Sequence, residues 1–439
     1  MFANGSTIQR SVIPTTESRR GPSGKTCQRT GSALSAAWER ISSRNLKIKD
    51  DIYWIGTLNP VLRTFDVIMN TEYGTTYNSY LICDEKVAIL DASPGSSPGL
   101  TDLYMDKVNA TVDPSKVEYI VVHHTEPDHT GALGTLLDAC PNAQVISTKI
   151  GAKWLREMLN RDFNSRTVED GDEISLGKRT LRFMTVPFWH WPDTMFTYIP
   201  EEKMLFTCDG FGAHFCDERM YDDLVDAEIY ERERQHYYDS IMRPFADKIH
   251  EGVQRVMQLD LEMICPSHGP IIRRDVAKVI DLYEQWSDAS RTPRQMVTVL
   301  YASAYGNTRR MAEAIAEGAS EHASVSLFDA AIANPAEVRD AIEASKGIIA
   351  GSCTINGDAL EAVWALLGLF ALVNRKGKVG ASFGSFGWSG EAVGMIEERM
   401  KGLRLKVVES GLRFCFVPTE DDLAKCRAFG KEFAKGLEA

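Results

Sequence analysis

The chain has 439 residues, of which 44% are hydrophobic and 25% are charged, as in globular proteins of two or three domains. Its formal net charge of -12 argues against a basic face for nucleic acid or for an anionic membrane surface. The longest apolar run, Ala362 to Val373, is shorter than the ~18 residues that a membrane span requires, so we interpret it as part of a core helix.

Residues 1–43 differ in composition from the rest of the chain. The first part of this segment is rich in Ser, Thr, Gly and Arg, and Glu17 is its one acidic residue. Two interpretations are open: a disordered tail, which we predict, and an organelle transit peptide, which is also rich in Arg and Ser and poor in acids. The missing apolar h-region argues against a secretory signal.

Residues 44–290 are predicted to form a mixed α/β domain, because short strand-like runs alternate with helical segments. Turn signals such as SPGSSPG at 93–99 separate the runs. The predicted strands include 52–55, 79–83, 87–90, 117–122 and 144–147, and the predicted helices include 149–161 and 222–257. A polar, proline-containing stretch from Ser290 to Arg294 is predicted to be a linker.

Residues 295–439 alternate strands and helices regularly. The predicted strands are 296–302, 324–328, 347–350, 378–383 and 405–407, and the predicted helices are 307–322, 335–345, 359–374, 391–402 and a last one from Glu420. Five β-α units predict a doubly wound parallel sheet, whose ligands bind at the carboxyl ends of the strands.

The nine cysteines are scattered along the chain and include no C-x-x-C pair. This pattern excludes a rubredoxin-type or zinc-ribbon module in this sequence. An odd, unclustered set favours free thiols in a reducing compartment, and hence a cytoplasmic location. An organellar matrix is the alternative if residues 1–43 are a transit peptide.

The densest group of potential metal ligands directly follows the predicted strand 117–122. It reads His-His-Thr-Glu-Pro-Asp-His over residues 123–129. A lone histidine is usually a satisfied core residue, but a structural role does not explain His, Glu, Asp and His together where an apolar strand stops. A loop at the end of a strand can turn several side chains toward one point, so we predict a metal site here.

Three further candidates occur in the same context. His190, Asp209 and His268 each follow a separate apolar, strand-like run. Side chains at the ends of separate strands converge most simply on one edge of a sheet. We therefore expect these three residues to meet the 123–129 loop.

The loop resembles the H-x-H-x-D-H signature of the metallo-β-lactamase superfamily and, more closely, the H-x-E-x-D-H loop of the flavodiiron proteins. His124, Glu126, Asp128 and His129 match that variant residue for residue. Glu126 replaces the neutral imidazole of the hydrolases by a hard anionic oxygen donor, which favours iron over zinc. The resemblance implies a metallo-β-lactamase-like αββα domain followed by a flavodoxin-like domain with a doubly wound parallel sheet.

The same resemblance implies two non-haem iron ions in each chain. The implied ligands are His124, Glu126 and His190 for one iron, Asp128, His129 and His268 for the other, and Asp209 as a bridge between them. In this family the counterpart of His129 either coordinates iron or is displaced by solvent, so its role stays open. His123 and His214 lie beside the matched motifs and could contact the ligands or line a pocket.

Three loops of the C-terminal domain carry the pattern of a flavin site. The first reads Ser303-Ala304-Tyr305-Gly306-Asn307-Thr308 and places hydroxyl groups and backbone N–H groups at a helix N-terminus, where a phosphate can bind. It has neither the lysine of a P-loop nor a G-x-G-x-x-G pattern, so the monophosphate FMN fits better than ATP or NAD.

The other two loops, 351–357 and 384–390, resemble the loops that flank the isoalloxazine ring in flavodoxins, and Trp388 is a candidate for stacking. Their candidate flavin-binding residues are Ser352, Cys353, Thr354, Asn356, Ser385, Phe386, Gly387, Trp388, Ser389 and Gly390. Family loops commonly carry proline at the position of Cys353. This difference could change the flavin potential or the stiffness of the loop, or it could simply be tolerated.

The resemblance implies an oxidoreductase that reduces O2 to water, NO to N2O, or both, with FMN feeding a di-iron site. It implies a head-to-tail homodimer or a dimer of dimers, and an external electron donor that is a rubredoxin-like protein or a flavin reductase. We expect no nucleic-acid or membrane partner. The main alternative is a metallo-β-lactamase-type zinc hydrolase fused to a flavodoxin module, and a regulatory FMN-binding protein with a degenerate metal site is a third reading.

Overall fold

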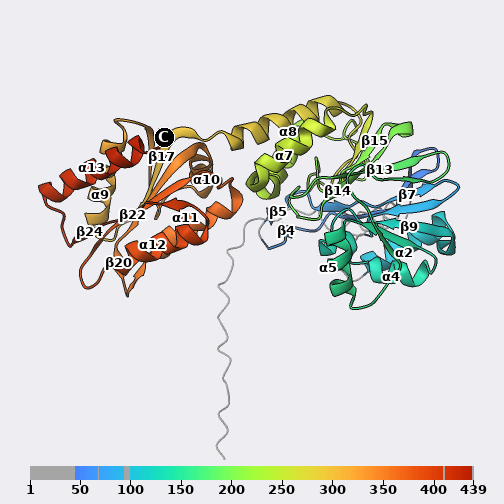
Figure 1. Ribbon diagram of the computed structural model, residues 1–439, viewed down its shortest axis with the longest axis horizontal. Coiled ribbons are helices and arrows are strands. Elements are labelled where there is room, and N and C mark those ends of the chain that lie inside the picture. The colour runs from blue at the N-terminus through green and yellow to red at the C-terminus, as the bar shows by residue number, and fades with distance from the viewer. Residues whose placement is uncertain (1–44, 68, 93–98, 409–410, 438–439) are drawn as a thin grey trace, which may run out of the picture. The chain divides into compact units, whose positions relative to one another are not determined.

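The computed structural model describes residues 45–67, 69–92, 99–408 and 411–437, so the predicted tail at 1–43 lies outside the described residues. Two sheets form the centre of the N-terminal domain (Figure 1). The first has the order β1 (Leu46–Lys49), β2 (Ile52–Trp54), β7 (Tyr80–Cys83), β8 (Val87–Leu90), β9 (Val117–Val121), β10 (Gln144–Ser147) and β11 (Ser165–Thr167). The second has the order β12 (Glu173–Ser175), β13 (Thr180–Thr185), β14 (Met195–Ile199), β15 (Met204–Phe206) and β16 (Met263–Cys265).

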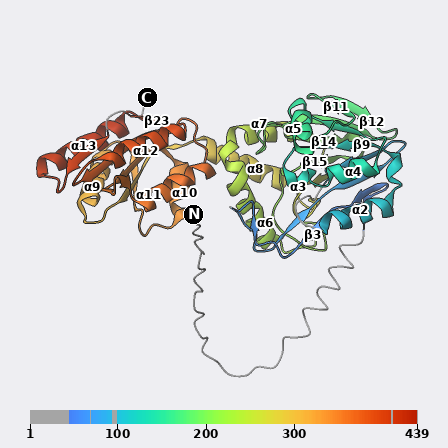
Figure 2. The same cartoon turned by 90° about the horizontal axis from the view of Figure 1, so that it is seen from below.

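The two sheets pack face to face, and helices cover their outer faces (Figure 1, Figure 2). Between the sheets, the ring of Tyr80 on β7 meets that of Phe206 on β15 edge-on, with 5.0 Å between centroids. The helices over the first sheet are α2 (Leu100–Thr111), α4 (Leu133–Ala139) and α5 (Lys149–Leu159), and those over the second are α7 (Ala246–Val256) and α8 (Val276–Arg291). The predicted αββα architecture is therefore confirmed.

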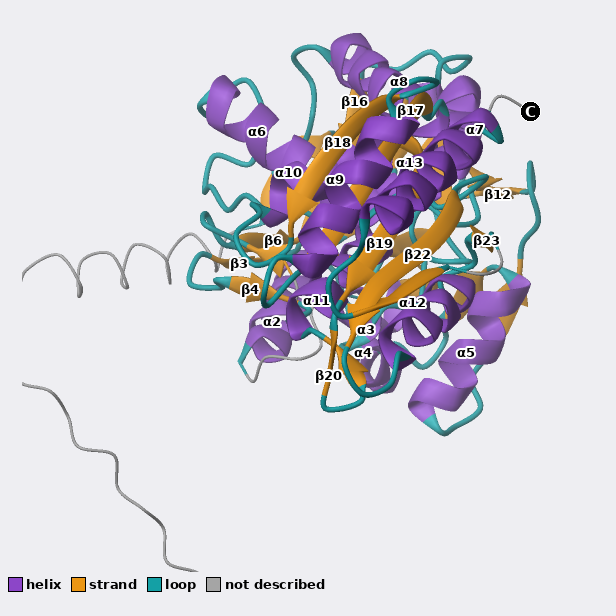
Figure 3. Ribbon diagram, turned by 90° about the vertical axis from the view of Figure 1, so that its left-hand side faces the viewer, coloured by secondary structure: helices purple, strands orange, loops and turns teal. Residues whose placement is uncertain are grey.

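The C-terminal domain contains one parallel sheet (Figure 3). Its order is β18 (Ser324–Asp329), β17 (Arg294–Ala302), β19 (Ser345–Ser352), β22 (Val379–Phe386) and β23 (Lys406–Val407), with β24 (Leu412–Cys415) also paired to β22. On one face lie α9 (Asn307–Ala319) and α13 (Glu420–Lys435), and on the other α10 (Pro335–Ala344), α11 (Glu361–Gly368) and α12 (Glu391–Gly402).

Strand β17 shows how the sequence produces this three-layer fold. Val297 and Val299 pack toward α9 and α13, whereas Leu300 and Ala302 pack toward the opposite helices. A central parallel strand is apolar on both faces because helices cover both of them. The predicted flavodoxin-like doubly wound sheet is confirmed.

Two local predictions need correction. The helix predicted over 222–257 is interrupted: α6 (Ala227–Tyr237) gives way to a π-turn, Tyr238–Met242, and a 3-10 turn, Arg243–Phe245, before α7 begins. Pro244 lies in this break, and proline cannot continue the hydrogen bonding of a helix. Strand β24 was not predicted, because its side chains alternate between partial and full exposure instead of being buried.

Helix α8 extends to Arg291 and β17 begins at Arg294, so only Thr292 and Pro293 separate these two elements. The boundaries predicted at 290 and 295 stay a prediction. Among the described residues, no helix combines the length and apolar character needed to cross a bilayer.

Candidate metal and flavin sites

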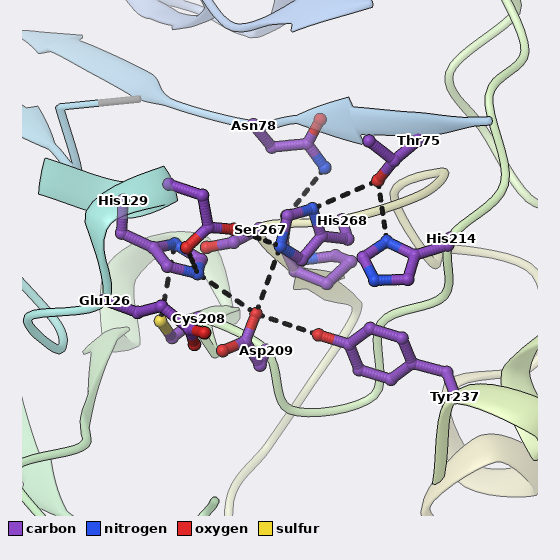
Figure 4. A network of polar contacts seen from close by, with 12 residues as sticks. Thr75, Asn78, Glu126, His129, Cys208, Asp209, His214, Tyr237, Ser267 and His268 are labelled. Carbon is purple, nitrogen blue, oxygen red and sulfur yellow. Dashed lines mark hydrogen bonds and ion pairs between the residues drawn. The ribbon is translucent and has the colours of Figure 1, made fainter. Parts of the chain in front are cut away.

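Loops that follow β9, β13, β15 and β16 meet at one edge of the two sheets and bring together all the predicted metal ligands. Figure 4 shows four of them, Glu126, His129, Asp209 and His268. Strands β13 and β15 both run antiparallel to β14, and β16 runs parallel to β15, so the carboxyl ends of these three strands share an edge. The N–H of Met195, at the start of β14, donates to the carbonyl of His123 at 2.9 Å and joins the loop after β9 to the same edge.

Asp209 lies at the centre of the cluster. Its Oδ2 is 2.7 Å from Nε2 of His124 and 2.9 Å from Nε2 of His190. Its Oδ1 is 3.2 Å from Nε2 of His129 and 3.4 Å from Nε2 of His268. Each carboxylate oxygen thus faces a different pair of histidines, which is the arrangement that a carboxylate bridging two metal ions requires.

The other two carboxylates divide between these pairs. Glu126 Oε2 is 3.1 Å from His190 Nε2 and 3.8 Å from His124 Nε2. On the other side, Asp128 Oδ2 is 3.0 Å from Nε2 of His268, and Asp128 Oδ1 is 3.4 Å from Nε2 of His129. The candidate ligands therefore form two groups, each with two histidines and one carboxylate, on either side of Asp209.

The burial and the negative charge of the cluster fit the binding of metal cations. Glu126, Asp128 and Asp209 are all buried, and buried carboxylates are costly unless a cation compensates them. Both oxygens of Asp128 and Nε2 of His129 lie 3.0 to 3.4 Å from neighbouring ligand atoms, yet within the described residues they make no hydrogen bond of favourable geometry. Buried ligand atoms that converge in this way fit a pair of metal ions.

The pKa values report the same concentration of negative charge. Burial alone would lower the pKa of His190, but hydrogen bonds to Asp209 and Glu126 raise it to about 9. Burial alone would raise the pKa of Asp209, but the His129 and His124 rings hold it well below its ordinary value. A field that draws protons onto imidazoles also attracts metal cations.

The ring of His268 is oriented by residues around strand β6 (Thr75–Tyr77). Its Nδ1 lies 2.6 Å from the carbonyl oxygen of Thr76, and the Thr76 hydroxyl accepts from the N–H of Gly269 at 2.7 Å. The amide of Asn78 donates to the carbonyls of Pro266 and Gly269, each at 2.8 Å. With Nδ1–H engaged by a carbonyl, Nε2 of His268 carries the lone pair that can bind a metal.

Two residues near the centre were not predicted. The hydroxyl of Tyr237 donates to Asp209 Oδ1 at 2.9 Å from helix α6. Asp66 lines a narrow cavity beside Glu126 and His190, where burial and the neighbouring Glu126 raise its pKa to about 7. Neither residue belongs to a ligand motif, and the chain folds each onto the site from a distant segment, so only the tertiary structure shows them. The cavity is also lined by Phe65, Met69 and Ile241.

His123 and His214 lie near the site in different roles. The His123 ring contacts Asp91 Oδ2 through Nδ1 at 2.9 Å and Thr197 Oγ1 through Nε2 at 2.8 Å, so it ties the loop to both sheets. His214 contacts Thr75 Oγ1 through Nδ1 at 2.7 Å and packs against the ring of Phe65. His123 therefore braces the fold, and His214 packs beside the ligands.

A pocket in the C-terminal domain is lined by the three predicted flavin loops. Its lining residues are Ala304, Tyr305, Asn307, Cys353, Thr354, Ile355, Asn356, Ser385, Phe386, Gly387, Trp388 and Phe416. Ile355 and Phe416 were not predicted, and Phe416 comes from the turn after β24. Tyr305 is 91% exposed and Trp388 is 89% exposed, so both rings are free to contact a flat ligand.

The remaining predicted flavin residues do not line this pocket. Thr308 and Ser352 are fully buried. The Thr308 hydroxyl lies 2.8 Å from that of Ser385, and the Ser352 hydroxyl donates to the Cys353 carbonyl at 2.8 Å, so both brace the loops. The others outside the lining are Ser303, Gly306, Ser389 and Gly390.

The start of α9 fits a phosphate group. Gly306 adopts a φ of 82° directly before the helix, and no side chain caps the first N–H groups. The buried hydroxyl oxygen of Ser303 has no hydrogen-bond partner in the described parts of the chain. Free N–H groups, a free hydroxyl and the positive end of the helix dipole together fit a neutral-donor phosphate site such as FMN would occupy.

Comparisons with known proteins cover both domains. Residues 75–269 match the family described as ODP family beta lactamase, and residues 299–430 match flavodoxin. The chain is 38% identical to the flavo-diiron protein FprA2 of Clostridium acetobutylicum, over 89% of this chain and 99% of that protein. It is 35% identical to a nitric oxide reductase of Moorella thermoacetica, over 89% and 98%.

Solved structures match the chain across both domains. The rubredoxin oxygen:oxidoreductase of Desulfovibrio gigas matches with a TM-score of 0.70 at 28% identity, over 90% of this chain and 99% of that one. The flavodiiron protein of Giardia intestinalis matches with a TM-score of 0.67 at 29% identity, over 90% and 97%. Similarity of this extent across both domains shows that the chain belongs to the flavo-diiron protein family.

Proposed function

We propose that this chain is an oxidoreductase that reduces O2 to water, NO to N2O, or both, at a di-iron site supplied with electrons by FMN. The observation that carries the proposal is the position of Asp209, whose two oxygens each face a separate pair of histidines. The names of the matched relatives, which include nitric oxide reductase and rubredoxin oxygen:oxidoreductase, support this activity.

We assign His124, Glu126 and His190 to one iron, and Asp128, His129 and His268 to the other, with Asp209 shared. Three carboxylates give this set a formal charge that balances ferrous and ferric iron better than an all-histidine set would. Bound iron would bind and reduce the gas, and bound FMN would supply the electrons. Zinc hydrolysis is not favoured, because relatives that match both domains are named flavo-diiron protein and nitric oxide reductase.

The chain's own residues set the environment of the gas. Phe65, Met69 and Ile241 provide apolar walls to the cavity, which suits small apolar molecules such as O2 and NO and limits water. Tyr237 holds Asp209 in the bridging orientation through its hydrogen bond. Asp66 lines the same cavity beside Glu126, where its protonated form can donate a hydrogen bond.

Flavin loops Ser303 to Thr308, 351–357 and 384–390 would hold FMN, with the start of α9 available to its phosphate and the Tyr305 and Trp388 side chains available to its ring. The metal and flavin sites belong to different domains of the chain. We therefore propose a head-to-tail homodimer, or a dimer of dimers, that brings the flavin of one chain to the metal centre of its partner. Full turnover by a dilute monomer would contradict this assembly.

The electron donor is proposed to be a separate rubredoxin-like protein or a flavin reductase. We place the protein in the cytoplasm, because the described cysteines are all free thiols, as expected in a reducing compartment.

Replacing Asp209 tests the assignment. Asp209→Ala should reduce O2 and NO consumption on the order of 1,000-fold or more, since it removes a ligand shared by both metals. FMN content should be unchanged. The control is Asp217→Ala, because the Asp217 carboxylate accepts from Arg219 Nε at 2.7 Å outside the cluster. Retained turnover in Asp209→Ala would refute the bridging role.

A further inference from the structure

The two histidines on the Asp128 side of the cluster are held by unequal partners. Nδ1 of His268 lies 2.6 Å from a backbone carbonyl oxygen, which is a strong acceptor. Nδ1 of His129 instead faces the sulfur of Cys208, at 3.8 Å (Figure 4). Sulfur is a weak acceptor, so the orientation of His129 depends on a softer and longer contact.

We propose that Cys208 is a positioning residue that fixes the ring of His129 and so determines whether His129 binds the second iron. When Nδ1–H donates to the Cys208 sulfur, Nε2 carries the lone pair. That Nε2 lies 3.2 Å from Asp209 Oδ1 and 3.4 Å from Asp128 Oδ1, close enough for the three atoms to hold one ion together. This proposal rests on the proposed di-iron function and addresses the ligand whose role the sequence left open.

The backbone places the Cys208 thiol for this task. Cys208 has a φ of 49°, in the left-handed region that favours glycine and that is strained for other residues. Glycine would adopt this turn more easily, but it would leave Nδ1 of His129 without its acceptor. The chain therefore carries a side chain that contacts His129 at a position where the backbone conformation favours glycine.

Cys208 also connects the remaining ligands of the same ion. It directly precedes Asp209 in the chain, and its carbonyl accepts from the N–H of Ser267 at 2.6 Å, next to His268. The residue is buried in the loop after β15 and contacts the loops after β9 and β16. One residue thus contacts His129 through its side chain and the His268 loop through its backbone.

The test compares Cys208→Ala and Cys208→Ser with the wild-type chain in its FMN-containing form. Anaerobic titration with Fe2+ measures the affinity for each iron, and a 57Fe Mössbauer spectrum reports the coordination of each site. Cys208→Ala should weaken the second iron about 10- to 100-fold and change the spectrum of one site, because removing a partner of a ligating histidine typically has this effect. Cys208→Ser, whose hydroxyl can accept, should bind the second iron more tightly than Cys208→Ala.

Cys140→Ala is the matched control, since Cys140 is a buried thiol in the core under the first sheet, away from the ligands. FMN content and circular dichroism verify that each variant is folded. If Cys208→Ala does not fold, Cys208→Gly takes its place, because glycine suits the φ of 49° and also removes the acceptor. Wild-type affinity with a wild-type spectrum in that variant would overturn the proposal. Two irons bound equally well by wild type and Cys208→Ala would overturn the Cys208 role alone, whereas a wild-type chain without iron would overturn the proposed function with it.

Discussion

The metal centre and the flavin pocket are both formed by loops that follow strands, but they use opposite kinds of side chain. The metal centre consists of buried carboxylates and imidazoles, whereas the flavin pocket offers hydroxyls, backbone N–H groups and two exposed aromatic rings. Charged groups held in a core need their ions, while neutral donors in an open pocket are satisfied by water. The metal centre should therefore depend on its ligand for stability far more than the flavin pocket does.

Removing the metal should give the largest effect. Three buried carboxylates without a cation are expected to cost the N-terminal domain about 3–5 kcal/mol, which corresponds to a fall in Tm on the order of 10 °C. Removing FMN should shift the transition of the C-terminal domain by less. Differential scanning calorimetry of native, chelator-treated and FMN-depleted protein measures both shifts. Equal Tm shifts in the two domains would show that the metal centre depends on its ligand for stability no more than the flavin pocket does.

Changing one ligand should alter the choice of metal. Glu126→His converts the loop to the H-x-H-x-D-H pattern of the zinc hydrolases and removes a hard oxygen donor. We expect the iron-to-zinc ratio, measured after reconstitution with both metals, to fall about 10-fold. The Glu126→Gln variant keeps an oxygen donor but loses its charge. Its iron-to-zinc ratio should lie between those of the wild type and Glu126→His. An unchanged ratio in Glu126→His would show that other residues select the metal.

On the flavin side, Ser303→Ala should lower the affinity for FMN about 10-fold, because it removes one hydrogen bond to a charged phosphate. Iron content should be unchanged. Ser320→Ala, at the far end of the same helix, serves as the control, since its hydroxyl donates to the Glu317 carbonyl instead. Fluorescence titration of the flavin-free protein measures the affinity, and equal loss in both variants would argue against a phosphate at Ser303.

The smallest effect is expected at Trp388. Trp388→Ala should weaken FMN binding about 3- to 10-fold by removing a stacking partner, and Trp388→Phe should restore most of it. The flavin absorption band should also shift in the alanine variant. If Trp388→Ala and Trp388→Phe bind FMN with equal affinity, the indole of Trp388 does not stack on the flavin and stays in solvent.

The residues of these sites that directly follow strands could be predicted from the sequence. The predicted strand at 144–147 agrees with β10, and all predicted metal ligands meet at one edge, because a buried strand ends where its apolar run ends. The sequence could not show Tyr237, Asp66 or the contact of Cys208 with His129. These contacts come from segments that are far apart in the chain, and only the packing of helices and turns brings them together.

Metal analysis of the purified chain, together with its absorption spectrum, tests the central claim most directly. We expect about two irons and one FMN per chain, with a flavin absorption spectrum. Zinc without flavin would contradict it.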